Sequence, residues 1–408
     1  MTTLATRTLI ATTAIQAVAA CAALTVPSIS PVIAAQLAVP VSTVGTYLSL
    51  LYLGASAAAL AGGGVVLRFG ALRLSQACLL ACAAGLLLML VPGTAGSVLA
   101  LVAAAASALV IGIGYGPITP ASSHLLVRTT PPARMALVFS IKQTGVPVGF
   151  AMAGLIVPPL TVWLGWHAAV VLIAVGCVIV MAAAQPLRQP LDDDRDPEAR
   201  LSAGALVSGL AVVAREPALR LLALVSFVYA GMQMSVSGFI VAYLHVEIGL
   251  GLITAGTALT VSSVAGVVAR IAWGSLSDRT GAPRATLAII GYLMAAASLA
   301  AALITPAWPL AAVMVVAAAL GATAVGWNGV YLSEVARRAP PGEAGRATGG
   351  CLFFTYVGVV ILPFLFGWLQ RATGSFALCF MVAAAVCAAV GVMLSGRGGR
   401  ARVRSSSP

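Results

Sequence analysis

Two basic residues, Lys142 and Arg270, lie inside long apolar runs of this chain. A charged side chain within the hydrocarbon of a bilayer is costly, and by default it marks a functional site. No Asp or Glu occupies the middle of any apolar run, so neither cation has an evident acidic partner in the sequence. A guanidinium fork matches a carboxylate in two hydrogen bonds, and an ammonium adds positive potential. The pair therefore predicts a site for a small anion.

Both residues also allow a structural interpretation. Each lies toward one end of its apolar run, and a long basic side chain can extend from there to interfacial water. Snorkelling or structural pairing therefore remains the alternative to anion binding for Lys142 and for Arg270.

Uncharged polar and aromatic residues at comparable depths are secondary candidates for the same substrate site. An amide is costly in lipid, which favours Asn328, whereas a Tyr or Trp in a span often serves packing or anchors the interface. The candidates are Tyr115, Gln143, Tyr229, Gln233, Trp327, Asn328, Tyr331 and Tyr356, with Gln16 and Thr119 beside them.

A short charged loop occurs twice, about half a chain apart. The segment from Gly274 to Arg284 reads GSLSDRTGAPR, and the segment from Gly63 to Arg73 reads GGVVLRFGALR, with Leu67 in place of the acid. Repeated loops between apolar runs indicate two duplicated halves, as in secondary transporters. Ion pairs in such loops can break and reform between two states, which predicts gating residues. These candidates are Gly274, Asp278, Arg279, Gly281 and Arg284 in the second copy, Arg68, Gly70 and Arg73 in the first, and Glu334 and Arg338 further along.

The elements that must position these residues follow from composition. The chain has 408 residues, of which 61% are hydrophobic and 8% charged, and its mean hydropathy is +1.07. Soluble domains carry about 25% charged residues, so lipid is the expected solvent. All seven cysteines lie within apolar runs without metal-ligand spacing. We expect no metal and no cofactor.

Twelve transmembrane helices are predicted, because a helix needs about 20 apolar residues to cross the hydrocarbon. The long uncharged stretches that hold two spans each are divided at Pro-containing or Gly-containing turns. The predicted spans are 8–35, 41–62, 74–91, 98–127, 136–160, 167–186, 219–244, 252–274, 286–305, 309–334, 347–369 and 375–395.

The distribution of basic residues predicts the orientation of these spans. Of the 22 Lys and Arg residues, 19 fall in alternate loops and tails on one side, and only Arg371 falls on the other. Such an excess marks the cytoplasmic side. We expect a multi-pass protein of the plasma (inner) membrane with both termini in the cytoplasm. This topology accounts for the net charge of +12 and leaves no case for nucleic-acid binding.

The one long polar stretch divides the chain into two halves. Its centre, Asp192-Asp-Asp-Arg-Asp-Pro197, cannot cross a bilayer and is interpreted as part of a solvated linker. The predicted organisation comprises an N-terminal six-helix half (1–186), a cytoplasmic linker (187–218), a C-terminal six-helix half (219–396) and a basic cytoplasmic tail (397–408).

These features together resemble the major facilitator superfamily over essentially the whole chain. The resemblance implies an all-α membrane fold of twelve helices in two pseudo-symmetric halves around a central cavity, with the loop at Gly274–Arg284 serving as a conformational lock. Arg270-Ile-Ala-Trp-Gly274 also looks like the helix-8 arginine of monocarboxylate transporters and oxalate–formate exchangers, which engages the substrate carboxylate. The acid that the monocarboxylate pattern carries one turn earlier is Gly266 here.

We therefore expect a secondary active transporter that moves a small organic anion, with a monocarboxylate favoured, by alternating access. The alternative is a proton-driven efflux antiporter for drugs or metabolites. Gly145-Val-Pro-Val-Gly149 favours that alternative, whereas the lack of a mid-membrane carboxylate disfavours it. Three histidines without a His-Glu-x-x-His pattern argue against an enzyme. The expected partners are the small-molecule substrate and the lipid bilayer, and the protein is expected to be a monomer.

Overall fold

The computed structural model describes residues 3–91, 97–131, 134–194, 204–341 and 343–396. These residues form helices, and no strand occurs among them. Twelve helical segments in the described part are long and apolar enough to cross a membrane. The predicted all-α membrane fold with twelve spans is confirmed. The predicted tail, 397–408, lies outside the described residues.

Short connections join most consecutive spans, which places these spans side by side and antiparallel. The N-terminal half contains α1 (Thr3–Ser28), α2 (Ser30–Leu37), α3 (Val44–Phe69), α4 (Ala71–Leu88), α5 (Val98–Tyr115), α6 (Ile118–Thr129), α7 (Met135–Gln143), α8 (Gly145–Leu164) and α9 (Trp166–Ala184). The linker range contains α10 (Arg188–Leu191) and α11 (Gly204–Arg215). The C-terminal half contains α12 (Pro217–Ala242), α13 (Leu252–Thr280), α14 (Pro283–Ala302), α15 (Leu310–Ala324), α16 (Asn328–Arg338), α17 (Ala344–Thr373) and α18 (Phe376–Ser395).

The first predicted span is shorter than expected. Instead of one helix over 8–35, α1 ends at Ser28 and α2 begins at Ser30. Pro27 lies inside the last turn of α1, and Pro31 occupies the first turn of α2, where its missing N–H costs nothing. Proline therefore separates a membrane span from a short helix that the apolar composition alone had merged with it.

Three spans are interrupted near their middle, and the breaks supply backbone groups to the interior. The break between α5 and α6 lies at Gly116-Pro117, that between α7 and α8 at Thr144, and that between α15 and α16 at Val325–Trp327. Irregular backbone at membrane depth is tolerated where protein or a lined cavity covers it. These breaks therefore place free carbonyl groups beside the axis between the two halves.

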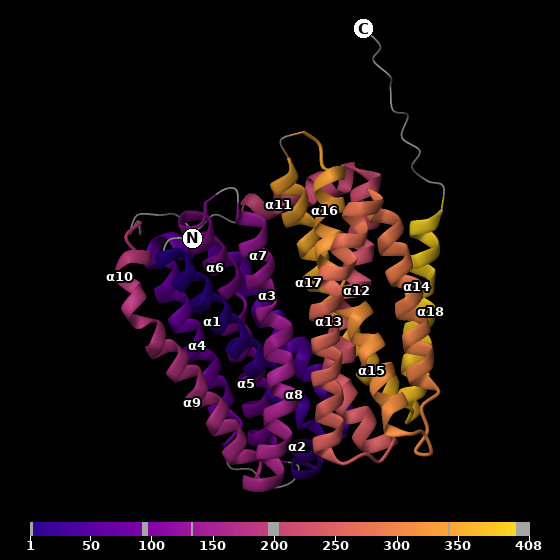
Figure 1. The fold of residues 1–408 in the computed structure, drawn as a ribbon. Helices are drawn as coiled ribbons and strands as arrows, with labels where there is room; N and C mark the ends of the chain where they lie inside the picture. Colours follow the sequence, from indigo (N-terminus) through magenta and orange to yellow (C-terminus); the bar gives the residue numbers. More distant parts are fainter. Residues whose placement is uncertain (1–2, 92–96, 132–133, 195–203, 342, 397–408) are drawn as a thin grey trace.

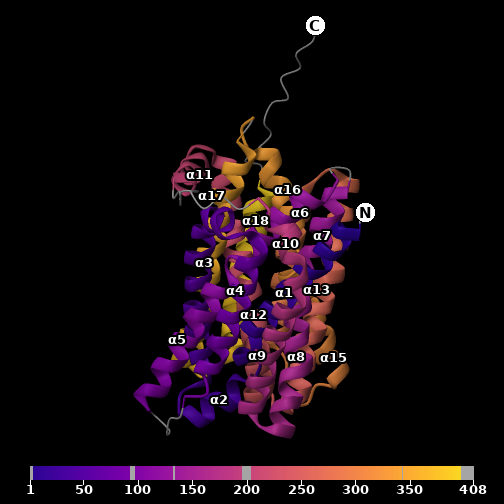
Figure 2. The same cartoon turned by 90° about the vertical axis from the view of Figure 1, so that its left-hand side faces the viewer.

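The two halves stand side by side as separate bundles (Figure 1). Turning the molecule by 90° brings the N-terminal half to the front, with α6, α7 and α10 near one end and α2 at the other (Figure 2). α1 begins and α18 ends at the same end of the bundle (Figure 1). Arg68, Arg128, Arg284 and Arg337 lie at helix ends there, and we call this end the basic face.

The duplication is visible in how corresponding helices pack. A Cβ atom on Gly112 of α5 would lie 1.9 Å from the Leu51 carbonyl oxygen of α3. A Cβ atom on Gly321 of α15 would lie 1.7 Å from the Ser262 carbonyl oxygen of α13. Any side chain would collide with the neighbouring backbone, so both pairs of helices require glycine in order to touch.

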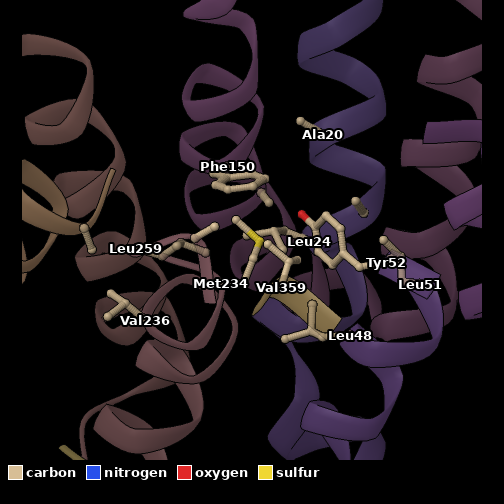
Figure 3. Close-up of a cluster of buried hydrophobic side chains, with 14 of the residues drawn as sticks. Ala20, Leu24, Leu48, Leu51, Tyr52, Phe150, Met234, Val236, Leu259 and Val359 are labelled. Atoms are coloured by element: carbon tan, nitrogen blue, oxygen red, sulfur yellow. The ribbon is translucent and has the colours of Figure 1, made fainter. Parts of the chain in front are cut away.

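Away from the basic face, the two halves are joined by buried apolar side chains (Figure 3). Six helices from both halves contribute to this cluster, and its side chains exclude water from the interface between them. The labelled members are Ala20, Leu24, Leu48, Leu51, Tyr52, Phe150, Met234, Val236, Leu259 and Val359.

Candidate functional site

Arg270 lies on α13 at the interface between the halves and reaches two helix breaks. Its Nε donates to the Val325 carbonyl oxygen at 3.0 Å, at the end of α15. Its Nη1 donates to the Gln143 carbonyl oxygen at 3.3 Å, at the end of α7 in the other half. An arginine carries five N–H donors. In the described part of the chain the remaining three have no acceptor, so the guanidinium can still bind an anion.

Lys142 converges on the same point from the N-terminal half. It is buried, with 1% of its side chain exposed, so it does not snorkel to the surface in this conformation. Its Nζ lies 3.4 Å from the Gln143 Oε1. Gln143 thus contacts both cations, Lys142 through its side chain and Arg270 through its backbone carbonyl. The break between α7 and α8 positions both contacts.

Gly266, where the monocarboxylate pattern carries an acid, has no room for one. It is buried on α13, and a Cβ atom there would lie 2.6 Å from the Val325 Cβ. Because α13 approaches the end of α15 so closely, Arg270 meets the Val325 carbonyl in place of a carboxylate. The Arg270 guanidinium is thus bound by uncharged carbonyl groups. Its positive charge is not neutralised by them and remains available to an anionic ligand.

Three tyrosines, on α3, α5 and α17, lie near one another in the interior. The rings of Tyr52 and Tyr115 meet edge to face with centroids 6.1 Å apart. Tyr115 lies near both Arg270 and Tyr356. Of the predicted tyrosines, the structure therefore brings Tyr115 near the predicted arginine.

A second aromatic group belongs to the C-terminal half. The Trp327 ring packs edge to face against Tyr229 and Tyr331, with centroids 5.8 Å and 5.2 Å away. The Tyr229 hydroxyl donates to the Leu287 carbonyl oxygen of α14 at 2.8 Å, so this tyrosine braces its own half. Gln233 on α12 is buried, and Asn328, at the start of α16, is half-buried.

Several buried polar atoms in this region have no hydrogen-bond partner among the residues that the structure describes. They include Gln16 Nε2 and Thr13 Oγ1 on α1, Tyr52 OH on α3 and Trp327 Nε1 beside α16. An unpaired buried donor is costly, and a ligand can satisfy it. Gln16 also accepts from Thr119 Oγ1 at 3.2 Å, and its side chain lies against Gly145 just after the break.

Thr13 and Tyr52 are candidates that sequence reasoning missed. Both lie in apolar spans without a charged neighbour, and Tyr52 belongs to a span for which no site residue was predicted. The only sequence feature that could have identified them is a polar group in the middle of an apolar span. That signal alone does not distinguish a residue that faces the axis from one that faces another helix.

The second copy of the charged loop lies at the basic face and is tied to its own half. Gly281 ends α13 with φ +62°, a left-handed conformation that glycine adopts without strain. Arg284 donates to the carbonyl oxygens of Leu394 at 2.9 Å and Gly396 at 3.1 Å, at the end of α18. Cations stabilise the negative end of a helix, so Arg284 anchors α18.

Other predicted gating residues occupy the same face in different ways. Glu334 is buried and pairs with Arg338, whose Nε lies 2.8 Å from the Glu334 Oε1. Asp278 and Arg279 are exposed, Gly274 is half-buried, and Asp278 forms no ion pair among the described residues. In this conformation, therefore, the acid of the loop is not engaged.

The first copy of the loop obtains its carboxylate from the linker. Asp192 accepts hydrogen bonds from the backbone N–H groups of Leu72 at 2.7 Å and Arg73 at 2.9 Å. These groups begin α4 and have no partner within the helix. Gly70 precedes them with φ +93°, and a Cβ atom there would lie 2.6 Å from the Asp192 Cγ. Asp192 thus caps α4 in the loop copy whose own acid is replaced by Leu67.

The next two aspartates bind the end of α6. Arg128 pairs with Asp193 at 2.5 Å and with Asp194 at 2.7 Å. His124 Nε2 lies 2.6 Å from the Asp194 Oδ2. The hydrogen bond from Arg128 lowers the pKa of Asp193. The contribution of that pair to stability is thus complete above the ordinary aspartate pKa and is lost as the pH falls through the lowered value.

Replacing Asp192 with Ala should lower the free energy of unfolding by about 1 kcal/mol, the usual cost of removing a helix cap. Asp193→Ala is the matched control, because it removes an adjacent carboxylate whose exposed ion pair contributes little. Thermal unfolding of the purified proteins in detergent measures both. Equal shifts for the two variants would show that capping of α4 has no special role.

Contacts between the halves concentrate away from the basic face. Ser49 Oγ on α3 donates to the Val360 carbonyl oxygen of α17 at 2.6 Å. Thr260 Oγ1 on α13 donates to the Ala151 carbonyl oxygen of α8 at 3.1 Å. At the basic face, the bonds of Arg128, Arg284 and Arg338 described above stay within their own half and the linker. The two halves are therefore in contact at the end opposite the basic face.

With this geometry in place, residues 12–349 match the family model described as Major Facilitator Superfamily. The chain belongs to the Major Facilitator Superfamily. Two relatives, each named an uncharacterized MFS-type transporter of Mycobacterium tuberculosis (strains CDC 1551 / Oshkosh and ATCC 25618 / H37Rv), are 27% identical over 241 residues. The match covers 58% of this chain and 52% of each relative, so the chain spans about half the length of the relatives it matches.

Solved structures show the same superfamily fold over almost the whole chain. A mutant of the nucleoside transporter NupG aligns with a TM-score of 0.78 at 14% identity, covering 95% of this chain and 99% of that one. A peptide transporter POT in complex with sulfate aligns with a TM-score of 0.72 at 16% identity, covering 95% and 93%. A bacterial homologue of the lysosomal transporter Spinster aligns with a TM-score of 0.69 at 15% identity, covering 97% and 95%. This superfamily member thus has the twelve long apolar helices of a multi-pass membrane protein.

Proposed function

We propose that this transporter carries a small organic anion, with a monocarboxylate favoured, by alternating access as a secondary active carrier. The observation that carries the proposal is the convergence of Arg270 and Lys142 on Gln143 without a carboxylate among the described residues around them. A buried Lys142 and a half-buried Arg270 place positive charge in the interior that a bound anion can compensate. A substrate carboxylate supplies it and can accept from the free N–H groups of Arg270.

The neighbouring donors favour an organic substrate over a bare inorganic ion. Unpaired N–H groups of Gln16 and Trp327 lie in the same interior as the two cations. Tyr115 lies near Arg270, and Tyr52 packs against the Tyr115 ring. A carboxylate attached to a small body with further acceptors would use both kinds of group.

The proposal also includes the orientation of the protein in the membrane and the change of conformation during transport. The basic face is cytoplasmic, because the excess of Lys and Arg marks that side of the membrane. The closed outer ends then make this the conformation that opens to the cytoplasm. Rocking of the halves would bring the basic-face loops together and separate the outer contacts.

Uptake measurements in proteoliposomes test the function directly. A panel of labelled monocarboxylates, dicarboxylates, inorganic anions and neutral drugs is offered with and without a pH gradient. Accumulation of a monocarboxylate, with competition by other monocarboxylates, is the expected result. Transport of neutral or cationic drugs in exchange for protons, with no carboxylate transport, would overturn the proposal in favour of efflux.

Gating by the second loop makes a separate prediction. Asp278→Asn should slow transport at least tenfold while membrane insertion stays intact, because we propose that the exposed carboxylate pairs across the basic face only when that face closes. Initial uptake rates at matched protein density measure the effect. Ser333→Ala on α16 is the control, since its hydroxyl bonds only the Val330 carbonyl oxygen within its own helix. Normal turnover of the Asp278 variant would contradict a gating role and would leave the loop only a role in orienting the protein in the membrane.

A further inference from the structure

A second basic site lies at the basic face of the C-terminal half, away from Arg270. A cavity of about 560 Å³ opens between the start of α14 and the inner ends of α16 and α18. Arg284, Arg337 and Arg338 line it, together with the single acid Glu334. Three guanidinium groups against one carboxylate leave two positive charges in excess. The transport site does not use this cavity.

The cavity continues onto the flank of the bundle. Ile289 and Tyr292 on α14 form part of its wall and are 46% and 41% exposed. Both belong to a membrane span, so their exposed parts face lipid. α14 and α18 stand at the outer edge of the C-terminal half (Figure 1). A molecule in this cavity can thus place a charged group among the arginines and an apolar chain along α14.

We propose that this cavity binds the phosphate of an anionic phospholipid from the cytoplasmic leaflet. Guanidinium forks match phosphate oxygens in paired hydrogen bonds. Basic pockets between helices at a membrane surface that is rich in anionic lipid are suited to such headgroups. The exposed apolar wall selects a lipid over free phosphate, because only a lipid fills the cavity and the flank together. The assignment of the leaflet rests on the orientation given in the proposed function.

Two arginines of this cavity also bond to elements near the charged loop from Gly274 to Arg284. Arg337 Nη1 donates to the Gly281 carbonyl oxygen at 3.2 Å, at the turn that ends α13. Arg338 pairs with the buried Glu334. A bound phosphate would compete for both arginines, and it would therefore act on the two elements that meet the other half when the basic face closes.

Native mass spectrometry of the full-length protein in detergent tests the site. Phosphatidylglycerol, phosphatidylcholine and inorganic phosphate are added separately, and the bound fraction is measured. Arg337→Gln should weaken phosphatidylglycerol binding about fivefold, which corresponds to about 1 kcal/mol for one basic residue at the surface. Arg346→Gln is the matched control, because this exposed arginine lies at the same face outside the cavity and should leave binding unchanged.

The other outcomes separate the sources of phosphate. Equal losses for the two variants would show only general attraction to the basic face and would overturn the site. Binding of inorganic phosphate that depends on Arg337, without binding of phosphatidylglycerol, would overturn the lipid assignment. Equal affinity for phosphatidylcholine and phosphatidylglycerol would also contradict it. None of these results depends on which solute is transported, so the lipid site and the proposed function can fail independently.

Discussion

Replacing Arg270 with Gln is expected to remove most of the affinity for an anionic substrate. A hydrogen bond to a charged group contributes about 1.5–3 kcal/mol, or roughly a 10-fold to 150-fold change in the dissociation constant. Arg270→Lys should lose a similar amount, since a compact ammonium lacks the planar fork that reaches the Val325 and Gln143 carbonyls and still offers two parallel N–H groups to a carboxylate. Equilibrium binding of the best substrate from the uptake panel measures both variants.

Two comparisons make the Arg270 result specific. Lys142→Gln should weaken binding less, because Lys142 adds potential without a planar fork. Arg279→Gln, an exposed arginine on the same helix, should leave equilibrium binding unchanged even if it slows turnover. Unchanged affinity in both Arg270 variants, with normal thermal stability, would assign Arg270 to the bond between the halves and would move the efflux alternative ahead.

Replacing Gly154 with Val should abolish transport while the protein still inserts. Gly154 lies on α8 where it meets α13, and a Cβ atom there would lie 2.5 Å from the Gly256 carbonyl oxygen and 2.9 Å from Thr260 Oγ1. Backbone atoms cannot yield to a branched side chain, and overpacking costs about 1–3 kcal/mol or more. The outer ends of the halves could then no longer close, so the cycle would stop.

Gly176→Val provides the matched control for that experiment. Gly176 also lies within a span, on α9, but a Cβ atom there meets nothing within 4 Å. We expect its uptake rate to stay within about twofold of the parent, since a β-branched residue costs little in an uncrowded helix position. Accessibility of a cysteine introduced near the outer end of α8 should rise in the Gly154 variant alone. Normal transport by Gly154→Val would show that α8 and α13 need not touch during the cycle.

The interruption of spans near the site illustrates what local sequence can and cannot convey. Gly116-Pro117 is a recognisable breaker, since proline removes a backbone donor. The Gln143–Thr144 break has a breaker too, since Pro147 supplies no N–H to the carbonyl four residues before it, whereas Val325–Trp327 contains only Gly326. Arg270 meets the carbonyls of these two breaks. Their irregular backbone is maintained by packing of α8, α13 and α15, which are distant from one another in the chain.

In the linker, too, composition predicts the environment of the residues but not the groups that they contact. Its acidic composition predicts that residues 192–194 lie outside the bilayer, because carboxylates cannot enter hydrocarbon without a partner. Composition also suggested a solvated segment, whereas Asp192 caps α4 and its two neighbours bind Arg128 and His124. An unpaired helix start can accept a carboxylate from any segment that reaches it, and chain connectivity alone does not identify that segment.

The sequence by itself determined the twelve apolar spans, and it predicts the two halves and the placement of Lys142 and Arg270 within the membrane. These properties depend on the length of apolar runs and on where charges interrupt them, which are local quantities. Only the tertiary structure decided what each charge meets. Arg270 bonds residues 55 and 127 positions away, and Asp192 bonds one 120 positions away. Such partners are set by how helices pack against one another, because a hydrogen bond requires atoms within about 3 Å in space and is indifferent to their separation along the chain.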